Sequence, residues 1–509
     1  MGEAIMEDKV FQREEFTRIL TKCHNTIRNN DKLSPEAAFD EISKVLFIKM
    51  WKEKQTGEIY TLAKFDEENE KSPTTNYYTV LFFDTRNHYL GDKIFEKNER
   101  LNIRENSFRD ILGALSNLNL AAASDDVRGI AFEQFLGKTF RGELGQFFTP
   151  RKIVEFMVQV LDPQEGELIC DPCCGSGGFL INAFEHVRAA IMHDNKGDEI
   201  DRVKKLATEC VFGVDANPRM ARTAKMNMMM HGDGHSGVHH HDGFLNVNGI
   251  FEDRFHVILT NPPFGSKVNK KLQIAESDRF TDEAKIKEYT KRYGNRYKKA
   301  MEQIEKNIGK SLLTLFPISK YTNLTETLFL DRCLDLLVPG GRMGVVLPEG
   351  VLNNKKLEDV RRYVEGRAKI VMVVSLPTDV FMAAGANVKP SILFLKKFTD
   401  SEADEYTRTL AKIKEDVKAA HQTEVEELTT KIKAVNDDEK RKKLRARLRK
   451  LNEQMKEETH KRLKEALDYE VLMASVDKAG INSVGAECEN ELVDLLKEIK
   501  EYKSKHQLW

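Results

Sequence analysis

The stretch ELICDPCCGSGGF, residues 167–179, decides the fold class. A short apolar run ends at Asp171, a glycine-rich turn follows, and the residues after that turn have helical spacing. Glycines at such a turn let backbone N–H groups approach a ligand at the carboxyl-terminal edge of a sheet, where open α/β folds bind. The stretch therefore predicts a strand, a ligand-binding turn and a helix.

Short apolar runs of the same kind recur further along the chain. They are VFGV before Asp215, HVILT before Asn261, and then GRMGVVLP and KIVMVVSL, with helical stretches between them. Strands that alternate with helices predict an α/β fold with a mostly parallel, doubly wound, Rossmann-like sheet. The distance between Asp171 and Asp215 exceeds the roughly 20 residues usual between two such strand ends, which predicts an extra helix between Val187 and Glu209.

Helical spacing on both sides of this core predicts three domains. Residues 1–141 form a helical N-terminal domain, in which Ser34 and Pro35 suit the start of a helix. Residues 142–398 form the α/β domain. Residues 399–509 form a helical region, in which two apolar series separated by Asn436-Asp437-Asp438 predict a coiled-coil hairpin for subunit assembly.

Length and charge exclude several classes of protein. The 509 residues carry a net charge of −1, so any contact with nucleic acid has to use local basic clusters or a basic partner. No apolar run approaches the roughly 20 residues of a bilayer span, and the N-terminal segment lacks the pattern of a secretory signal. A soluble protein of the cytoplasm, with no membrane partner, is expected.

Three acidic strand ends form the expected cofactor site. A carboxylate at Asp171 suits the cationic amino group of a methionine moiety, which favours S-adenosylmethionine over a dinucleotide as the ligand of this turn. Asp215 suits the two ribose hydroxyls of a nucleoside. Asp242 can accept a hydrogen bond from the cofactor's adenine amino group, and Phe244 can cover its ring.

The motif Asn261-Pro262-Pro263-Phe264 at the end of HVILT predicts the chemistry. An amino group conjugated to an aromatic ring is a poor nucleophile, because its lone pair is delocalised. The side-chain carbonyl of Asn261 and the backbone carbonyl of Pro262 can each accept one N–H and so localise that lone pair. Pro263 stiffens the turn, and Phe264 offers a flat face to a base that has left the duplex.

In this order the motifs resemble the N6-adenine DNA methyltransferases, and most closely the modification subunit of type I restriction-modification systems. In that family a segment before the glycine-rich turn closes over S-adenosylmethionine, and GQFFTPR at residues 145–151 resembles it. Cys173 and Cys174 depart from the small residues typical of the turn. The resemblance implies that the cofactor site is lined by Gln146, Phe147, Phe148, Thr149, Pro150, Arg151, Ser176, Gly177, Gly178 and Asp215. Together with Asp171, Gly175, Phe179, Asp242 and Phe244, these are the expected cofactor-binding residues.

The same resemblance implies the substrate and the partners. The substrate is double-stranded DNA, methylated on adenine N6 by transfer from S-adenosylmethionine. No stretch stands out as a base-reading domain, so a separate specificity subunit is expected to choose the sequence, with two copies of this chain for each specificity subunit. A restriction and translocase subunit completes the larger complex. By general position only, Phe381 flanks the flipped base. The basic residues after the target motif could hold phosphates near that base, or could belong to a charged mobile loop matched by neighbouring Glu and Asp; they are Lys267, Lys270, Lys271, Lys291, Arg292, Arg296, Lys298 and Lys299.

Other readings of the sequence remain open. The same motifs could methylate a protein glutamine amide or an amino group of RNA, or the core could be an inactive assembly scaffold. Cys170 and Cys173 have CxxC spacing and a His-rich run covers residues 231–241, but a structural zinc site needs matched pairs of ligands. We therefore expect no metal.

Overall fold

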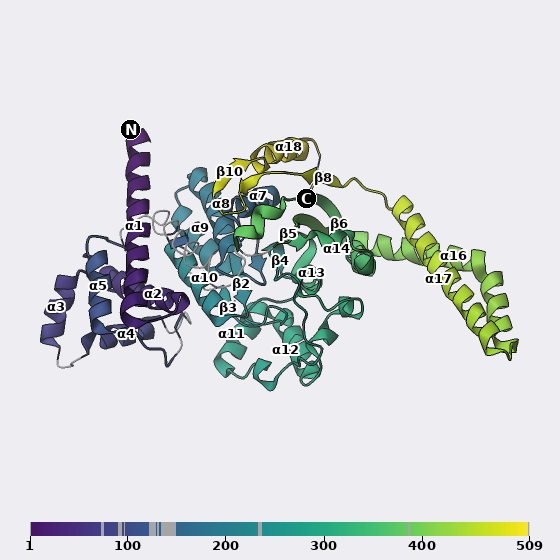
Figure 1. Ribbon diagram of the computed structural model, residues 1–509, viewed down its shortest axis with the longest axis horizontal. Helices are drawn as coiled ribbons and strands as arrows, with labels where there is room; N and C mark the ends of the chain where they lie inside the picture. The colour runs from purple at the N-terminus through teal and green to yellow at the C-terminus, as the bar shows by residue number, and fades with distance from the viewer. Residues whose placement is uncertain are drawn as a thin grey trace.

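The computed structural model describes residues 2–72, 76–89, 94–95, 97–121, 129, 132–133, 149–232, 237–384, 387–506 and 508–509, with side chains from residue 15 onward except at 383 and 384. N-terminal helices, a central sheet and a long helical hairpin follow one another along the longest axis (Figure 1). The predicted site residues Gln146, Phe147 and Phe148 lie outside the described residues.

Helices make up the N-terminal region, as the sequence predicts: α1 (Gly2–Asp31), α2 (Pro35–Thr56), α3 (Leu62–Lys71), α4 (Tyr77–His88) and α5 (Glu105–Leu115). Ser34 Oγ accepts a hydrogen bond from the Ala37 backbone N–H at 3.3 Å, and Pro35 opens α2. Gly57 ends this helix with a φ of 70°, a left-handed conformation that favours glycine.

The core is an eight-stranded sheet in the order β3-β2-β1-β4-β5-β7-β6-β8. Strand β7 runs antiparallel to β5 and β6, and the other neighbours are parallel, which confirms the predicted mostly parallel sheet. The strands are β1 (Ile169–Asp171), β2 (Val211–Asp215), β3 (Val238–His240), β4 (Phe255–Thr260), β5 (Leu337–Pro348), β6 (Ala368–Ser375), β7 (Pro390–Lys397) and β8 (Leu472–Ser475).

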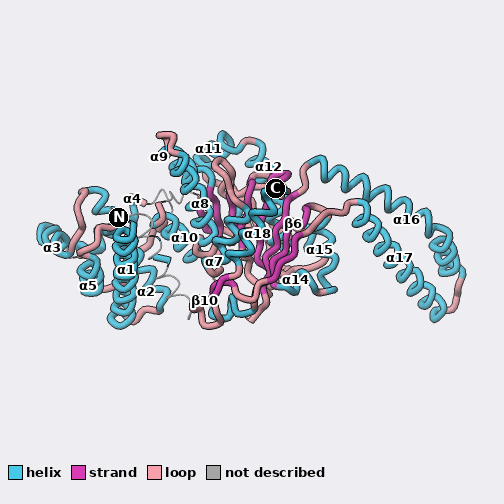
Figure 2. Tube along the Cα trace, turned by 90° about the horizontal axis from the view of Figure 1, so that it is seen from above, coloured by secondary structure: helices cyan, strands magenta, loops and turns pink. Residues whose placement is uncertain are grey.

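Helices lie on both faces of the sheet, which confirms the doubly wound prediction (Figure 2). One face carries α7 (Arg151–Leu161), α8 (Gly178–Asp194) and α18 (Leu492–Lys505), and the other carries α13 (Thr325–Leu336), α14 (Glu349–Asn353) and α15 (Glu358–Glu365). Side chains of β4 alternate between the two layers, since Val257 and Leu259 join the first apolar cluster and Ile258 the second. The predicted extra helix before β2 is α9 (Glu199–Lys205).

Helix α10 (Pro218–Met230) joins the sheet to the N-terminal helices. Its Met228 packs in the core of the sheet, whereas Met220, Met226 and Met230 pack in the core of the N-terminal region. An ion pair lies beside this apolar contact: Arg222 Nη1 of α10 is 2.6 Å from Glu99 Oε1 of the N-terminal region. Apolar and charged contacts therefore hold the two regions together.

Residues 265–324 form an insertion between β4 and α13. It contains α11 (Glu283–Tyr293), α12 (Asn295–Asn307) and the 3-10 turns Glu276–Asp278, Leu312–Leu315 and Pro317–Lys320. The first loop of the insertion is anchored at both ends, since single bridges pair Lys267 with Leu324 and Ile274 with Ile308. The insertion therefore starts and ends beside the predicted target motif.

The C-terminal region contains the predicted hairpin, formed by α16 (Asp400–Ala434) and α17 (Asp438–Ala466). The two arms are linked by His421 Nε2 and Glu458 Oε2 at 3.0 Å. After the hairpin the chain returns to the sheet as β8, a strand that the sequence analysis did not anticipate. Strands β9 (Ala479–Ile481) and β10 (Glu487–Asn490) then form a small separate sheet before α18.

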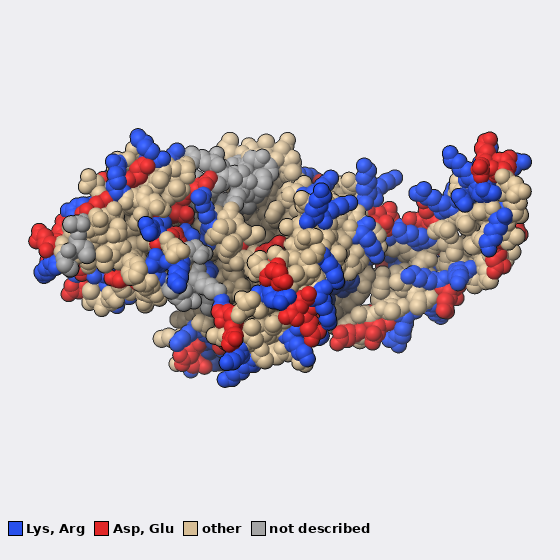
Figure 3. All heavy atoms as spheres, turned by 90° about the horizontal axis from the view of Figure 1, so that it is seen from below, with Lys and Arg blue, Asp and Glu red and all other residues tan. Residues whose placement is uncertain are grey.

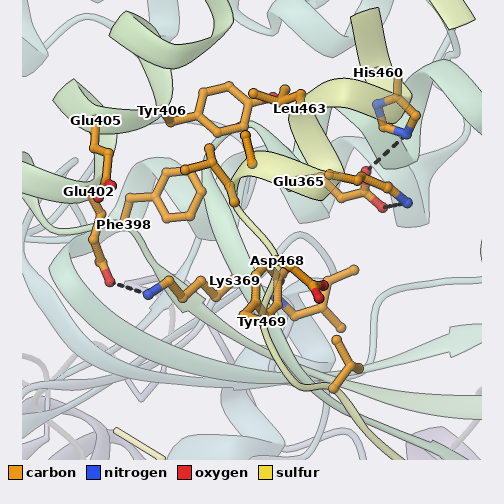
Figure 4. Close-up of a pocket in the computed structure, with 15 residues that line it drawn as sticks. Glu365, Lys369, Phe398, Glu402, Glu405, Tyr406, His460, Leu463, Asp468 and Tyr469 are labelled. Atoms are coloured by element: carbon orange, nitrogen blue, oxygen red, sulfur yellow. Dashed lines mark hydrogen bonds and ion pairs between the residues drawn. The ribbon is translucent and has the colours of Figure 1, made fainter. Parts of the chain in front are cut away.

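A cavity of about 510 Å³ lies at the root of the hairpin (Figure 4). Both ends of the hairpin reach it, because Phe398 precedes α16 and Tyr469 follows α17. The rings of Phe398 and Tyr406 lie 5.6 Å apart between their centroids, and Lys369 Nζ pairs with Glu402 Oε1 at 2.6 Å. The two ends of the hairpin therefore leave and rejoin the core at neighbouring points.

Among the described helices, none combines the length and the apolar character needed to cross a membrane.

Candidate active site

Three predicted site residues lie at the carboxyl ends of neighbouring strands. Asp171 ends β1, Asp215 ends β2, and Asn261 follows the last residue of β4. Strand β1 lies between β2 and β4, where the order of the strands changes direction. Doubly wound sheets bind ligands in the crevice at this point, so the fold brings the cofactor turn and the target motif to one edge.

Asp171 is buried, with 1% of its surface exposed. Its Oδ1 accepts hydrogen bonds from Thr260 Oγ1 at 2.7 Å and from the Cys173 backbone N–H at 3.1 Å. Burial raises the pKa of Asp171 to about 7, against an ordinary value of 3.8. A cationic ligand group beside this carboxyl would favour the ionised form and offset the cost of burial.

The glycine-rich turn allows close approach to its backbone. Gly175 and Gly177 have φ values of 51° and 84°, in the left-handed region that favours glycine. No described atom lies within 4 Å of the position that a Cβ would occupy at Gly175 or Gly178. Ser176 O accepts a hydrogen bond from Asn227 Nδ2 at 3.1 Å, which fixes the turn at the N-terminus of α8.

The two cysteines that depart from the family pattern pack beneath this turn. Because Thr260 donates its proton to Asp171, the Cys173 thiol donates to Thr260 Oγ1 at 2.9 Å. Cys174 is buried in the core beside α8. Burial raises the pKa of both thiols well above the ordinary value, so these cysteines support the turn as neutral groups.

Asp215 joins the second strand end to the turn. Its Oδ2 accepts from the Gly175 backbone N–H at 3.0 Å, and its Oδ1 accepts from the Asn217 N–H at 2.8 Å. Burial raises the pKa of this carboxyl. Each oxygen keeps a further lone pair, which suits the hydroxyls of a ribose.

Asp242 and Phe244 follow β3 and lie against the same turn. A Cβ at Gly243 would come within 2.1 Å of Pro172 O, so the two segments touch. Burial raises the pKa of Asp242, whose Oδ1 accepts from the Phe244 N–H at 3.0 Å. The Phe244 ring stacks on Phe329 at 4.3 Å and is 7% exposed, so most of its surface is covered by other side chains.

The amide of Asn261 has one end bonded and one end free. Its Nδ2 donates to Thr149 Oγ1 at 2.9 Å. Its Oδ1 is buried and has no hydrogen-bond partner among the described residues. A buried carbonyl without a donor costs free energy, so this oxygen is suited to accept an N–H from a ligand.

Aromatic rings flank the target motif. Phe264 is half-buried and meets Phe381 edge to face, with 5.9 Å between the ring centroids. Phe381 lies in the 3-10 turn Thr378–Ala384 between β6 and β7. Pro262 is buried and Pro263 is exposed. The sequence placed Phe381 near the motif only by general position, and the structure brings the two rings together.

Glu326 and Thr260 belong to this site, and the sequence analysis missed both. Glu326 is 3% exposed, and its two carboxylate oxygens accept from the Gly265 N–H at 3.3 and 3.2 Å. Burial raises the pKa of this carboxyl. The contact between Gly265 and Glu326 spans 61 residues, and the contact between Asp171 and Thr260 spans 89 residues. No local sequence pattern could reveal contacts over such separations.

Two predicted cofactor residues use their side chains elsewhere. The Arg151 guanidinium pairs with Glu133 at 2.6 Å, Glu155 at 2.9 Å and Glu185 at 3.5 Å. The Phe179 ring is 4% exposed and packs in the core. Pro150 directly precedes α7. Within the described residues, no group of three or more His, Cys, Asp or Glu side chains could hold a metal ion.

A family model described as N-6 DNA Methylase matches residues 123–310 and 293–470, well over half of the chain. The chain belongs to the N-6 DNA methylase family. The matched ranges contain the glycine-rich turn, Asn261 and the whole hairpin. The motifs quoted from the sequence, read in order, therefore identified the family correctly.

Several relatives of this chain are methylase subunits of type I restriction enzymes. The methylase subunit of the type I restriction enzyme EcoEI from Escherichia coli is 29% identical over 293 residues, which are 57% of this chain and 50% of the relative. The EcoKI methylase subunit from E. coli strain K12 is 28% identical over 262 residues, 50% of this chain and 41% of the relative. The chain spans about half the length of the curated relatives it matches.

Solved structures share the fold. A modification subunit of a putative type I restriction enzyme from Vibrio vulnificus YJ016 aligns with a TM-score of 0.51 and 20% identity, over 76% of this chain and 82% of that chain. A chain from a study of complex assembly and conformational transition of the type I R-M system also gives 0.51, with 22% identity over 76% and 74% of the two chains. The predicted methyltransferase-type core is confirmed.

Proposed function

We propose that this chain transfers a methyl group from S-adenosylmethionine to N6 of adenine in double-stranded DNA. The observation that carries the proposal is Asn261 Oδ1, a buried acceptor without a partner among the described residues, at the strand end next to the glycine-rich turn. Membership of the N-6 DNA methylase family supports the same reaction.

The residues at the strand ends fit S-adenosylmethionine. The buried Asp171 carboxyl suits the ammonium group of the cofactor, and Asp215 suits its ribose hydroxyls. The open backbone at Gly175 and Gly178 leaves room for the cofactor atoms that link these two groups. Asp242 suits the amino group of the cofactor's adenine. When bound, the cofactor supplies a methyl group on a positively charged sulfur, a leaving group that departs as a neutral thioether.

The target motif prepares the nucleophile. Asn261 Oδ1 and the Pro262 carbonyl each accept one N–H of the adenine amino group, so its nitrogen lone pair is localised and directed at the methyl carbon. An N–C bond forms as the C–S bond breaks, and the nitrogen then releases one proton to solvent. Thr149 holds Asn261 Nδ2, so the carbonyl end of the amide faces the base. Positioning and hydrogen bonding supply the catalysis.

A base has to leave the duplex to reach this site. Phe264 and Phe381 offer two rings, set edge to face, at the end of β4. We propose that the extruded adenine stacks on Phe264 while Phe381 supports that ring from the side. Stacking of this kind compensates for part of the stacking lost in the duplex.

The partners proposed are those of a type I modification subunit. The relatives are methylase subunits of multi-subunit restriction enzymes by name, and the hairpin α16–α17 offers a long surface for a specificity subunit. Two copies of this chain for each specificity subunit, a restriction and translocase subunit, and a place in the cytoplasm complete the proposal.

Mass spectrometry of nucleosides tests the reaction. The complex, purified from its host through a tag on this chain, is incubated with duplex DNA and S-adenosylmethionine that carries a deuterated methyl group. The label should appear in N6-methyldeoxyadenosine, and Asn261→Ala should abolish it while S-adenosylmethionine affinity stays within about twofold, less than 0.5 kcal/mol. Asn25→Ala, at an exposed position on α1, is the matched control. Label in protein or in another base would refute the proposal.

A further inference from the structure

Charge is distributed unevenly along the chain. The insertion, residues 265–324, holds fourteen Lys and Arg against seven Asp and Glu, although the whole chain has a net charge of −1. The insertion therefore carries a local positive excess that the rest of the molecule balances. Its first residue directly follows the target motif.

Three lysines of this insertion, Lys267, Lys270 and Lys271, form what we call the basic loop. All three are exposed, and no ion pair joins any of them to a described residue. Basic residues also cluster at 441–450 in α17, but there Arg441, Arg447 and Arg449 pair with carboxylates at 2.8, 3.2 and 3.2 Å. Blue and red side chains lie together along that hairpin (Figure 3).

The backbone of the basic loop is held in place. Ser311 Oγ donates to Lys270 O at 2.8 Å, and the Val268 N–H donates to Asn323 O at 2.9 Å. Ser266 Oγ donates to Thr325 Oγ1 at 2.8 Å, next to the Glu326 carboxylate that fixes Gly265. The lysines therefore project from a fixed frame rather than from a free loop.

The loop also lies close to the proposed base pocket. Lys267 is three residues after Phe264, so their Cα atoms are at most about 11 Å apart. Further along the same insertion, Lys310 is exposed. Lys320 Nζ lies 4.7 Å from the ring centroid of Tyr321, which is 40% exposed. Positive charge with an exposed ring is typical of surfaces that bind nucleic acid.

We propose that the basic loop binds the DNA phosphates that flank the flipped adenine. The inference rests on the proposed function, because it takes DNA as the substrate. Extruding a base leaves its two neighbouring phosphates to be held in position. Lysines that form no ion pair with any described residue can neutralise these phosphates and release counterions. The loop then fixes the strand while Asn261 and Phe264 hold the base.

The salt dependence of DNA binding tests this assignment. We compare the complex purified through a tag on the wild-type chain with the complex that carries the triple variant Lys267→Gln, Lys270→Gln, Lys271→Gln, on a fluorescent duplex across a series of salt concentrations. Each lost phosphate contact lowers the slope of log K against log salt by about 0.9, so the triple variant should lose about 2 to 3 from that slope. The matched control replaces Lys497, Lys500 and Lys505, three exposed lysines of α18, with Gln and should keep the wild-type slope.

Several outcomes would overturn the inference: a wild-type complex that does not bind the duplex, an unchanged slope in the triple variant, or an equal change in the control. If the triple variant does not melt cooperatively, the single variants Lys270→Gln and Lys271→Gln must each lower the slope by about 0.9. The labelled-methyl assay separates this failure from failure of the proposed function. Methylation with an unchanged slope refutes only the basic loop, whereas loop-dependent binding without methylation refutes only the reaction.

Discussion

At the residue scale, the chemistry depends on two buried groups at neighbouring strand ends. Burial opposes the charge of the Asp171 carboxyl, and Asn261 carries a buried carbonyl that has no donor among the described residues. Each is unfavourable in the unliganded fold and becomes favourable with a partner of the right kind, a cation for the first and an N–H for the second. Both groups therefore indicate ligands rather than packing.

The raised pKa of Asp171 predicts that S-adenosylmethionine binds more tightly as the pH rises toward about 7. Below that pH the carboxyl must lose its proton to meet an ammonium group, so affinity should rise by up to about tenfold per pH unit. Calorimetric titration of the wild-type chain between pH ~5 and ~7 measures this. Asp171→Asn should bind weakly with little pH dependence, and an identical pH profile in both would show that another group titrates.

The same shift has the opposite effect on the unliganded fold. The folded carboxyl holds its proton up to about pH 7, whereas an unfolded Asp releases it near pH ~3.9. The Asp171 contribution to the free energy of unfolding is therefore fully present below pH ~3.9 and is lost as the pH rises to about 7. Ligand binding and stability should thus respond to pH in opposite directions through this residue.

Phe264→Ala should reduce methylation of paired adenine far more than it reduces S-adenosylmethionine affinity. The substitution removes a ring that packs against Phe381 and is proposed to stack on the base, worth about 1–3 kcal/mol per stacked base. Initial rates on duplex DNA and cofactor titrations measure the two effects separately, with Phe83→Ala, at an exposed ring of α4, as the control. Equal losses in both would assign Phe264 to the cofactor.

The residues that the sequence revealed were those in local patterns. Asp171, Asp215 and Asn261 each follow a short apolar run, so their place at a strand end could be predicted. Thr149 could be assigned only to the cofactor segment, because its bond to Asn261 spans 112 residues. The directions of the Arg151 and Phe244 side chains depend on Glu133, Glu185 and Phe329, which come from distant parts of the chain.

At the element scale, the hairpin is inserted between two strands of the same sheet. Strand β7 leads into α16, and the chain returns after α17 as β8, which pairs in parallel with β6. Both ends of the hairpin line one cavity (Figure 4), so a short linker could join them and leave the sheet complete. Ion pairs join the lower part of α17 to α15, Arg362 with Glu457 at 2.7 Å and Lys456 with Asp359 at 2.5 Å. The outer parts of both arms extend away from the sheet (Figure 1).

Excision of residues 401–467, with a short Gly-Ser linker in their place, should leave S-adenosylmethionine binding intact. Strand β8 and the cofactor turn both remain, so the melting transition should persist. Association with the specificity subunit should be lost, because the proposed docking surface is gone. Co-purification through a tag on this chain checks the prediction. Undiminished recovery of the partner by the excised chain would show that docking occurs elsewhere.

The hairpin could be predicted because its two apolar series are long and a polar turn separates them. The strands after it could not. Strands β8, β9 and β10 are three or four residues long, and β10 has the sequence ECEN, which carries no apolar alternation. Their pairing partners, and not their own side chains, determine that they are strands.

At the scale of the whole molecule, α10 couples the cofactor site to the N-terminal helices. Its first turn follows Asp215, and its methionines enter two different cores. A shift of the N-terminal helices would therefore act on the strand end that is proposed to hold the ribose. The N-terminal helices and the sheet share this one helix.

Met226→Ala should lower the free energy of unfolding by about 2–5 kcal/mol, the usual cost of truncating a buried large side chain to Ala. Met226 is 1% exposed and packs in the N-terminal core. Chemical denaturation measures the loss. Met192→Ala, at a position on α8 that is 55% exposed, should change the value little. A similar change in both variants would mean that α10 does not hold the two regions together.

The central claim is methylation of adenine N6 in DNA by way of Asn261. Modified-base sequencing of the native host genome, with the wild-type gene and with the single chromosomal change Asn261→Ala, tests it most directly. N6-methyladenine should be present at one defined motif in the wild type and absent from that motif in the variant, with the protein at normal abundance. An unchanged pattern of N6-methyladenine in the variant would contradict the claim.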